Sequence, residues 1–316
     1  MAKPASLLKS PSLILSMRAL VTGATGFIGS NLTERLLKDG WEVVAAGMKN
    51  EQPLPIGVSK TILGDLGEIN WADLGKFDVI FHQAAITNTL VTDEKEMMRV
   101  NYYEAKRLFE WAMESGCKRI VYASSTAVYG AGRPPFKESD ECKPLNAYGK
   151  SKLELDEFVK LFADSNRDIV IVGLRYCNVY GKGESHKGKM ASMVYQLAQQ
   201  IKKGNPRVFT DGEQKRDYIY VGDVVDANLL AANARKSCIV NCAGGKATSF
   251  NELIGLIMRV SSFSRQIEYF ENPYAKTYQN HTECDMSYAK KMIGFAPKFT
   301  IETGISAYYG SGALFS

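Results

Sequence analysis

This 316-residue sequence has no long hydrophobic run, only three histidines and only a small excess of positive over negative charge. No stretch approaches the ~20 consecutive apolar residues of a membrane-spanning helix, so we expect no membrane association. The net charge of +5 is small and evenly spread. It argues against nucleic acid as a partner but suits a ligand that carries phosphates. These absences leave a globular protein with room for one large domain or two modest ones.

Cysteine and histidine are too scattered to indicate a metal site or a disulfide framework. The one close pair of the six cysteines, Cys238 and Cys242, lies in SCIVNCAG, which predicts a buried strand rather than a metal knuckle. Buried reduced thiols in a cytoplasmic protein are the better interpretation. His186 and His281 have no neighbouring ligands in the sequence, so we expect them to pack or hydrogen-bond, and we predict no metal.

The first sixteen residues, MAKPASLLKSPSLILS, differ from the rest of the chain. They are apolar only in patches, Lys9 and Pro11 interrupt any hydrophobic core of a signal peptide, and no small-residue cleavage site follows. A signal peptide is therefore disfavoured. We predict that residues 1–16 are an N-terminal extension and that Met17 is the candidate natural start.

From Met17 onwards, short apolar runs alternate with segments of helical spacing. Six runs predict buried strands: RALVTG, WEVVAA, KTILGD, DVIFHQAA, RIVYASS and DIVIVGLR. Helical spacing falls between them over 28–40, 93–116 and 148–165. This alternation is typical of an α/β fold built on a doubly wound parallel sheet of the Rossmann type. After Arg175 it gives way to loops and an isolated helix over 190–204.

The loss of alternation suggests a division into two domains. We predict a dinucleotide-binding domain over 17–177 and 217–243. A smaller, discontinuous substrate-binding domain is predicted over 178–216 and 244–316.

The first chemical signal is GATGFIG, which places Gly23, Gly26 and Gly29 between the first strand and the first helix. Glycines there let the backbone approach a pyrophosphate, and they leave the helix N-terminus free to point its N–H groups at it. A plain tight turn is the alternative. The position at the start of a βαβ unit favours a nucleotide cofactor.

The end of the second strand bears on which dinucleotide binds. Gly47 stands where an acid would hold the adenosine ribose of NAD, and Lys49 lies close by. We therefore predict NADP rather than NAD. Asp65, in LGDL after the third strand, is a candidate for facing the adenine, and an ordinary loop acid is the alternative.

The second signal is NAYGKSK. Tyr148 and Lys152 are four residues apart on a predicted helix, so they share a face. An amine beside a phenol favours the phenolate and makes the tyrosine a usable base. Upstream, YASSTAVYG ends a strand with Ser124 and Ser125, whose hydroxyls would emerge at the carboxyl edge of the sheet, where ligands bind in such folds.

Taken together, GxxGxxG, FHQAA, YASSTAVYG, YGKSK and RYCNVYG resemble the extended short-chain dehydrogenase/reductase family over nearly the whole chain from Met17. The resemblance implies a catalytic trio of Ser125, Tyr148 and Lys152, with the helical Asn101 near the nicotinamide. The implied cofactor contacts are Gly23, Gly26, Phe27, Ile28, Gly29, Lys49, Asp65, Leu66, Ala84, Asn101, Tyr148 and Lys152.

Three further stretches, NVYGKGESHKGKMAS, FTDGEQKRDYIYVGDVVDANL and NPYAKTYQNHTECD, resemble the ADP-L-glycero-D-manno-heptose 6-epimerase branch of that family. By this resemblance Lys187 is a second acid/base and Arg216 binds the diphosphate, since a guanidinium fork suits phosphate. A salt bridge from Arg216 to Asp217 is the alternative. The implied substrate contacts are Ser125, Asn178, Lys187, Lys189, Gln196, Phe209, Arg216 and Tyr278. Lys189, Gln196 and Thr277 depart from the residue types expected in the branch, which leaves the nucleoside and the sugar open.

The resemblance implies an epimerase that oxidises a nucleotide-diphosphate sugar transiently and reduces it again with a bound NADP. One alternative is 4-epimerisation or net reduction of another nucleotide sugar. A non-catalytic nucleotide-sensing protein is the second alternative, but such proteins usually have a broken Tyr/Lys pair, and here the pair is intact. We also expect a homo-oligomer.

Overall fold

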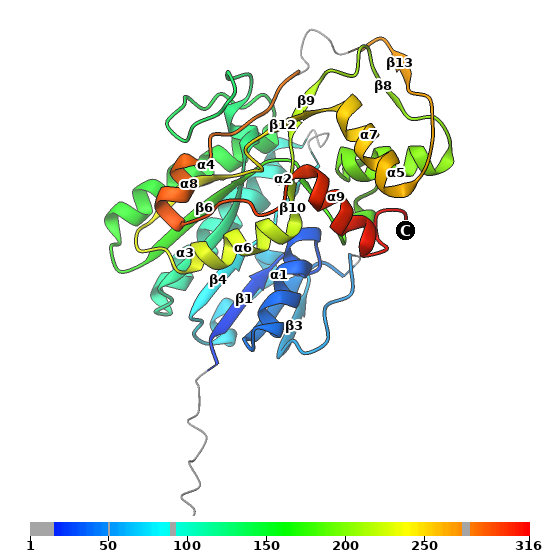
Figure 1. Ribbon diagram of the computed structural model, residues 1–316. Coiled ribbons are helices and arrows are strands. Elements are labelled where there is room, and N and C mark those ends of the chain that lie inside the picture. The colour runs from blue at the N-terminus through cyan, green and yellow to red at the C-terminus, as the bar shows by residue number, and fades with distance from the viewer. Residues whose placement is uncertain (1–15, 50, 89–92, 274–278) are drawn as a thin grey trace, which may run out of the picture.

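A parallel β-sheet forms the centre of the molecule (Figure 1). The computed structural model describes residues 16–49, 51–88, 93–273 and 279–316. The seven strands of the sheet run in the order β11-β6-β5-β4-β1-β2-β3. They are β1 Arg18–Thr22, β2 Glu42–Gly47, β3 Lys60–Leu63, β4 Val79–His82, β5 Arg119–Ser125, β6 Val170–Tyr176 and β11 Cys238–Cys242. The predicted doubly wound parallel sheet is confirmed, and both Cys238 and Cys242 lie in a strand, as expected.

Helices cover both faces of the sheet. On one face lie α1 (Phe27–Lys38), α6 (Val221–Ala232) and α8 (Ser287–Ile293), which share one buried apolar cluster with the strands. On the other face α3 (Glu104–Glu114) and α4 (Ala147–Ser165) contribute to a second cluster. Because both faces are covered, the strands read as nearly continuous apolar runs, which is why the sequence revealed them.

The helix predicted over 93–116 is interrupted, which the sequence pattern did not indicate. It consists of α2 (Glu94–Met98), one π-helical segment (Arg99–Tyr103) and then α3. Inside the π segment, Asn101 is fully buried, and its side chain hydrogen-bonds the backbone of Ile86 and the hydroxyl of Ser151. The wider turn gives Asn101 these partners, and π turns of this kind are frequent at functional sites.

A smaller region packs at one end of the sheet and contains most of the chain after Tyr176 (Figure 1). Its helices α5 (Met193–Lys203), α7 (Phe250–Ser261) and α9 (Ile301–Gly310) bury a third apolar cluster. Three strand pairs accompany them: β7 Val179–Tyr180 with β10 Ile219–Tyr220, β9 Lys215–Asp217 with β12 Ala247–Ser249, and β8 Arg207–Phe209 with β13 Glu268–Phe270. The exact boundaries of the two domains stay a prediction. No helix in the described ranges is both long enough and apolar enough to cross a membrane.

A buried ion pair lies between α4 and the sheet. Asp156 and Arg175 are 0% and 2% exposed, and the Arg175 Nε donates to the Asp156 carboxylate at 2.9 Å. Tyr122 donates to the other oxygen of Asp156 at 2.8 Å, and Arg175 also donates to the Tyr129 hydroxyl at 3.0 Å. With its partners satisfied, the pair fixes α4, and therefore Tyr148 and Lys152, against the strand that carries Ser125.

Removing one partner of this pair should therefore be costly. We expect Asp156→Ala to lower the free energy of unfolding by about 3–5 kcal/mol, because the Arg175 guanidinium would stay buried without its counter-charge. Replacing both residues, as in Asp156→Leu with Arg175→Met, should recover much of the loss. Urea unfolding followed by circular dichroism measures both. Asp164→Ala, at an exposed position of the same helix, is the control. If Asp156→Ala lowered the free energy of unfolding no more than the control does, this account would be contradicted.

Candidate active site

A cleft of about 520 Å³ lies along the carboxyl ends of β1, β2 and β4. The chain leaves β1 toward β2 on one side and later returns to β4 on the other, so the cleft occupies the point where the strand order reverses. Of the residues predicted to bind the cofactor, eight line it: Gly23, Gly26, Phe27, Ile28, Gly29, Asp65, Leu66 and Ala84.

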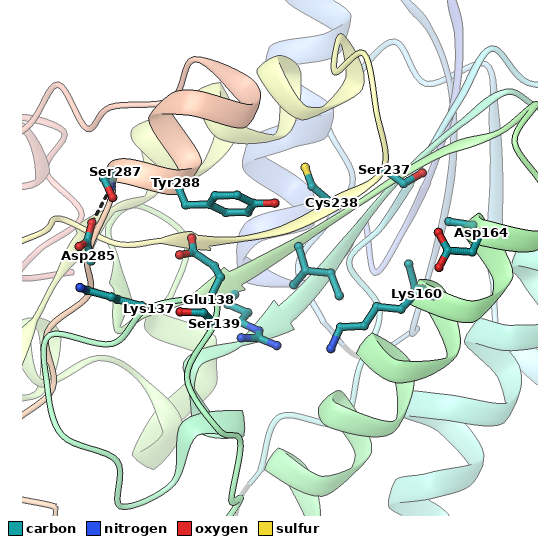
Figure 2. Close-up of a pocket in the computed structure, with 14 residues that line it drawn as sticks. Lys137, Glu138, Ser139, Lys160, Asp164, Ser237, Cys238, Asp285, Ser287 and Tyr288 are labelled. Carbon is teal, nitrogen blue, oxygen red and sulfur yellow. Dashed lines mark hydrogen bonds between the residues drawn. The ribbon is translucent and has the colours of Figure 1, made fainter.

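A second cavity, of about 580 Å³, lies between α4, β11 and α8 (Figure 2). Three of its charged groups have partners: Arg175 binds Asp156, Glu138 accepts the Asn241 N–H at 2.7 Å, and Asp285 accepts the Ser287 N–H at 2.8 Å. It holds none of the residues predicted for the site. The cleft at the strand ends is therefore the better candidate, although it is slightly smaller.

The glycine turn is shaped for close approach. Gly23 has a φ of +66°, and a Cβ on it would lie 2.7 Å from the backbone nitrogen of Ala84. A Cβ on Gly29 would lie 2.0 Å from the carbonyl oxygen of Gly23. Gly26 precedes α1 with no side chain to cap it, so the first N–H groups of the helix face the cleft side of the turn. This geometry fits the pyrophosphate of a dinucleotide.

The end of β2 differs from the sequence-based expectation. A Cβ on Gly47 would lie 2.3 Å from the Thr25 hydroxyl oxygen, so no acid fits at that position. The Thr25 hydroxyl instead donates to the carboxylate of Glu51, which lines the cleft. Lys49 is exposed and is not among the cleft-lining residues. The premise that this strand end offers no carboxylate was wrong, because the chain returns to the cleft four residues after Gly47.

Asp65 lines the cleft as part of an ion pair. Both of its oxygens accept from the Arg99 guanidinium, at 3.0 and 2.7 Å, and one also accepts the Gly67 N–H at 2.8 Å. The hydrogen bond from Arg99 is the largest cause that lowers the pKa of Asp65. Sequence reasoning found Asp65 but missed Arg99, because no local pattern pairs residues that lie on different elements.

The predicted trio comes together from two elements. Tyr148 and Lys152 lie on α4, which begins after Asn146, whose side chain accepts the Gly149 N–H at 2.8 Å. The Lys152 Nζ lies 5.9 Å from the centroid of the Tyr148 ring and donates to the Ala123 carbonyl at 2.8 Å. Ser125, at the end of β5, hydrogen-bonds the Tyr148 side chain.

The pKa values of this trio differ from the simple expectation of an activated phenol. Burial raises the pKa of Tyr148, and the hydrogen bond from Ser125 lowers it by less. Burial also lowers the pKa of Lys152 to about 8, while Asp156 acts to raise it. In the protein alone, therefore, Tyr148 stays a neutral phenol near pH 7. A lysine four residues along the helix therefore does not by itself make Tyr148 a phenolate, because burial has the largest effect on the pKa of Tyr148.

Asn101 does not line the cleft, although the residue before it, Val100, does. Its Oδ1 accepts the Ile86 N–H at 2.7 Å, and its Nδ2 donates to the Ser151 hydroxyl at 3.1 Å. Ile86 lines the cleft and Ser151 precedes Lys152. Asn101 thus ties the segment after β4 to the helix that carries Tyr148 and Lys152.

The lysine-rich loop reaches into the cleft through one lysine. Lys187 lines the cleft, and its Nζ lies 5.4 Å from the centroid of the Phe27 ring. Burial lowers the pKa of Lys187, and Glu184 acts to raise it. Lys182 instead pairs with Glu34 at 3.2 Å, and Lys189 is exposed. The loop is therefore more than a solvated run of charge.

The other predicted substrate contacts are spread over the smaller region. Asn178, at a φ of +37°, donates to the Asp217 carbonyl at 2.9 Å. Gln196 donates to the carbonyls of Ala191 and Lys189, at 2.7 and 3.2 Å, so its amide holds the loop. Tyr278 lies outside the described residues.

Phe209 and Arg216 each lie against an aromatic ring. Phe209 packs edge to face on Phe270, with 5.0 Å between ring centroids. The Arg216 guanidinium lies 6.0 Å from the centroid of Phe250. The alternative of an Arg216–Asp217 salt bridge is wrong, because the Asp217 carboxylate is buried and accepts backbone N–H groups of Gly244, Gly245 and Cys284.

The parallel sheet, the glycine turn at its reversal point and the Ser–Tyr–Lys trio define a dinucleotide-dependent enzyme of the extended short-chain dehydrogenase/reductase class. More particularly, residues 19–243 match the NAD dependent epimerase/dehydratase family, and the chain belongs to that family.

Two relatives of this chain have the same name. An ADP-L-glycero-D-manno-heptose-6-epimerase of Brachyspira hyodysenteriae is 34% identical over 307 residues, covering 92% of this chain and 96% of the relative. The crystal structure of the Helicobacter pylori ADP-L-glycero-D-manno-heptose-6-epimerase has a TM-score of 0.83 at 32% identity, covering 94% and 96%. The structure of MoeE5 in complex with UDP-glucose and NAD has a TM-score of 0.82 at 30% identity, covering 93% and 97%.

Proposed function

We propose that this protein is a nucleotide-diphosphate-sugar epimerase whose substrate is ADP-glycero-manno-heptose, inverted at the 6-position. The observation that carries the proposal is the arrangement of two acid/base groups. Tyr148 lies on α4 beside Ser125 and Lys152, and Lys187 enters the cofactor cleft from a separate loop. Inverting a carbon in this way requires hydride to leave one face and return to the other, and two acid/base groups on different elements suit the hydroxyl protons of the two epimers, one for each. The two heptose epimerase relatives support the choice of substrate.

The cleft fits a nicotinamide dinucleotide, since the glycine turn leaves no room for a side chain and presents helix N–H groups. The residues of this turn would hold the cofactor, which would supply hydride transfer with the sugar carbon in both directions. Tyr148, oriented by Ser125, would act as the base in its phenolate form: it would take the proton of the sugar hydroxyl and become the neutral phenol, and the Lys152 ammonium would favour the phenolate before that transfer. Lys187 is assigned to the proton on the other face, and its lowered pKa suits that exchange.

The next question is whether the cleft prefers NAD or NADP. The prediction of NADP rested on Gly47 and Lys49. Glu51 now counts against NADP, because its carboxylate lines the cleft and would repel a 2′-phosphate, while Lys49 is not among the lining residues. We infer that Glu51 selects between the two cofactors and favours NAD, the cofactor in the MoeE5 complex.

Neutralising Glu51 should change this preference. In Glu51→Gln, the affinity ratio of NADP to NAD should rise by roughly tenfold, which corresponds to about 1.4 kcal/mol. Isothermal titration of protein stripped of nucleotide measures both dissociation constants. Glu68→Gln, at an exposed position on the segment after β3, is the control. The assignment would be overturned if the wild type bound NADP more tightly than NAD and if Glu51→Gln left the ratio of the two dissociation constants unchanged.

The substrate can be tested directly. We expect the purified protein, without added cofactor, to convert ADP-glycero-manno-heptose between its 6-epimers, with product stereochemistry read by NMR. UDP-, GDP- and CDP-hexoses belong in the same panel, because 4-epimerisation of another nucleotide sugar is the first alternative. A requirement for stoichiometric NADPH would indicate a net reductase. No conversion at all, with dinucleotide still bound, would favour a nucleotide-sensing protein.

The two acid/base assignments predict that replacing either residue lowers the rate of epimerisation by a similar factor. Tyr148→Phe and Lys187→Met should each lower the rate of epimerisation by ~10²–10⁴, the usual contribution of general acid–base catalysis. Lys189→Met is the control from the same loop, and its effect should be mainly on KM. Initial rates and cofactor content measured on all three variants separate catalysis from folding. If Lys187→Met and Lys189→Met lowered the rate equally and only mildly, the loop would supply only diffuse positive charge.

A cytoplasmic location and a homo-oligomeric state stay predictions that follow from the sequence and the family resemblance. The fractionation of the native protein and its mass in solution would test them.

A further inference from the structure

A buried carboxylate closes the loop that carries Lys187. Glu184 is 0% exposed although it lies in a loop rich in lysine and glycine. One of its oxygens accepts the Gly181 N–H at 3.0 Å and the Ser192 hydroxyl at 2.9 Å. The other accepts the Ser192 N–H at 2.6 Å. Glu184 therefore holds together two points of the chain on either side of Lys187.

The same carboxylate fixes the loop to the smaller region. The Ser192 hydroxyl that donates to Glu184 also accepts the Tyr195 N–H at 3.2 Å, which makes Ser192 the N-cap of α5. Val194 and Leu197 of α5 lie in the apolar cluster shared with α7 and α9. The far end of the loop is thus anchored on a packed helix.

Side chains of the nucleotide-binding sheet region hold the near end. The Asn31 Nδ2, on α1, donates to the Lys182 carbonyl at 2.8 Å. The Gln52 Nε2 donates to the Gly183 carbonyl at 2.8 Å. The segment Ser185–Met190 lies between Glu184 and Ser192, lines the cleft with three of its residues and places Lys187 over Phe27.

We propose that Glu184 is a positioning residue for Lys187: its buried carboxylate closes the loop between Gly181 and Ser192 and supplies the negative charge that faces the Lys187 ammonium. This inference rests on the proposed acid/base role of Lys187. Glu184 itself does not line the cleft, so its effect must pass through Lys187.

The electrostatics support the geometry. Burial lowers the pKa of Lys187 and Glu184 opposes that effect, so loss of the carboxylate must lower the pKa of Lys187 further. The other titratable groups that face Glu184 are Tyr180 of β7, Tyr195 of α5 and Tyr308 of α9. The other titratable groups lining the cleft are Glu51, Asp65, Glu96 and His186.

Replacing the carboxylate by an amide of the same size tests the proposal. In Glu184→Gln, the pKa of Lys187 should fall by about half a unit or more, because an ammonium loses a close counter-charge. Titration of ¹³Cε-labelled lysines by NMR measures this pKa, with the Lys187 signal assigned by its absence in Lys187→Arg. The measurement does not require turnover, so it stands even if the proposed epimerase activity fails.

Activity provides the second readout. The limb of the pH–rate profile that disappears in Lys187→Met reports Lys187, and in Glu184→Gln that limb should move to lower pH. Glu184→Asp keeps the charge but shortens the reach, so it should lower kcat with a much smaller shift of the limb. The control is Glu34→Gln, which removes an exposed carboxylate that pairs with Lys182 of the same loop.

The outcomes are distinct. A lowered Lys187 pKa in Glu184→Gln alone, with Glu34→Gln like the wild type, supports the proposal. An unchanged Lys187 pKa in a folded Glu184→Gln variant overturns it, even if the activity falls, because a merely structural role would leave the titration in place. If Glu184→Gln does not fold, a fall of the Lys187 pKa by about half a unit or more in the charge-preserving Glu184→Asp overturns the proposal, and a smaller change supports it.

Discussion

The packing of the glycine turn against the end of β4 is the contact on which the rest of the site depends. Gly23 and Gly29 approach Ala84 and each other so closely that neither position has room for a Cβ. This contact fixes where α1 begins and leaves its first N–H groups on the cleft side. Because β2 and β4 flank β1, the cleft opens at the reversal of strand order, and Glu51, Asp65 and Lys187 line it.

Buried carboxylates organise much of what surrounds the cleft. Asp156 of α4 binds Arg175 of β6, and Glu184 closes the loop of Lys187. Asp217 gathers N–H groups from two segments of the smaller region, and burial raises its pKa to about 7 against those donors. In each case a charge that would be costly to bury alone is stabilised by several donors, so it joins segments that are distant in sequence.

We attribute the proposed cofactor and substrate preference to a few side chains around this framework. Glu51 reaches the cleft from beyond β2, while Thr25 occupies the space beside Gly47. Gln196, whose identity departs from the heptose epimerase pattern, uses its amide to hold loop carbonyls. Gln196 therefore acts first on the conformation of the loop, through the carbonyls of Lys189 and Ala191. The sheet and the glycine turn place the chain in its family. We assign the choice of cofactor and substrate to the few side chains named here.

The sequence by itself determined the parallel sheet, the glycine turn and the shared helix face of Tyr148 and Lys152, because strand burial and helical spacing are local patterns. The roles of Ser125, Tyr148, Lys152 and Lys187 are what the family resemblance implies. Only the tertiary structure decided that Glu51 lies in the cleft and Lys49 does not, that Asp65 pairs with Arg99, and that Glu184 is buried. These facts join residues on separate elements, and no periodicity along the chain encodes which side chains meet across a fold.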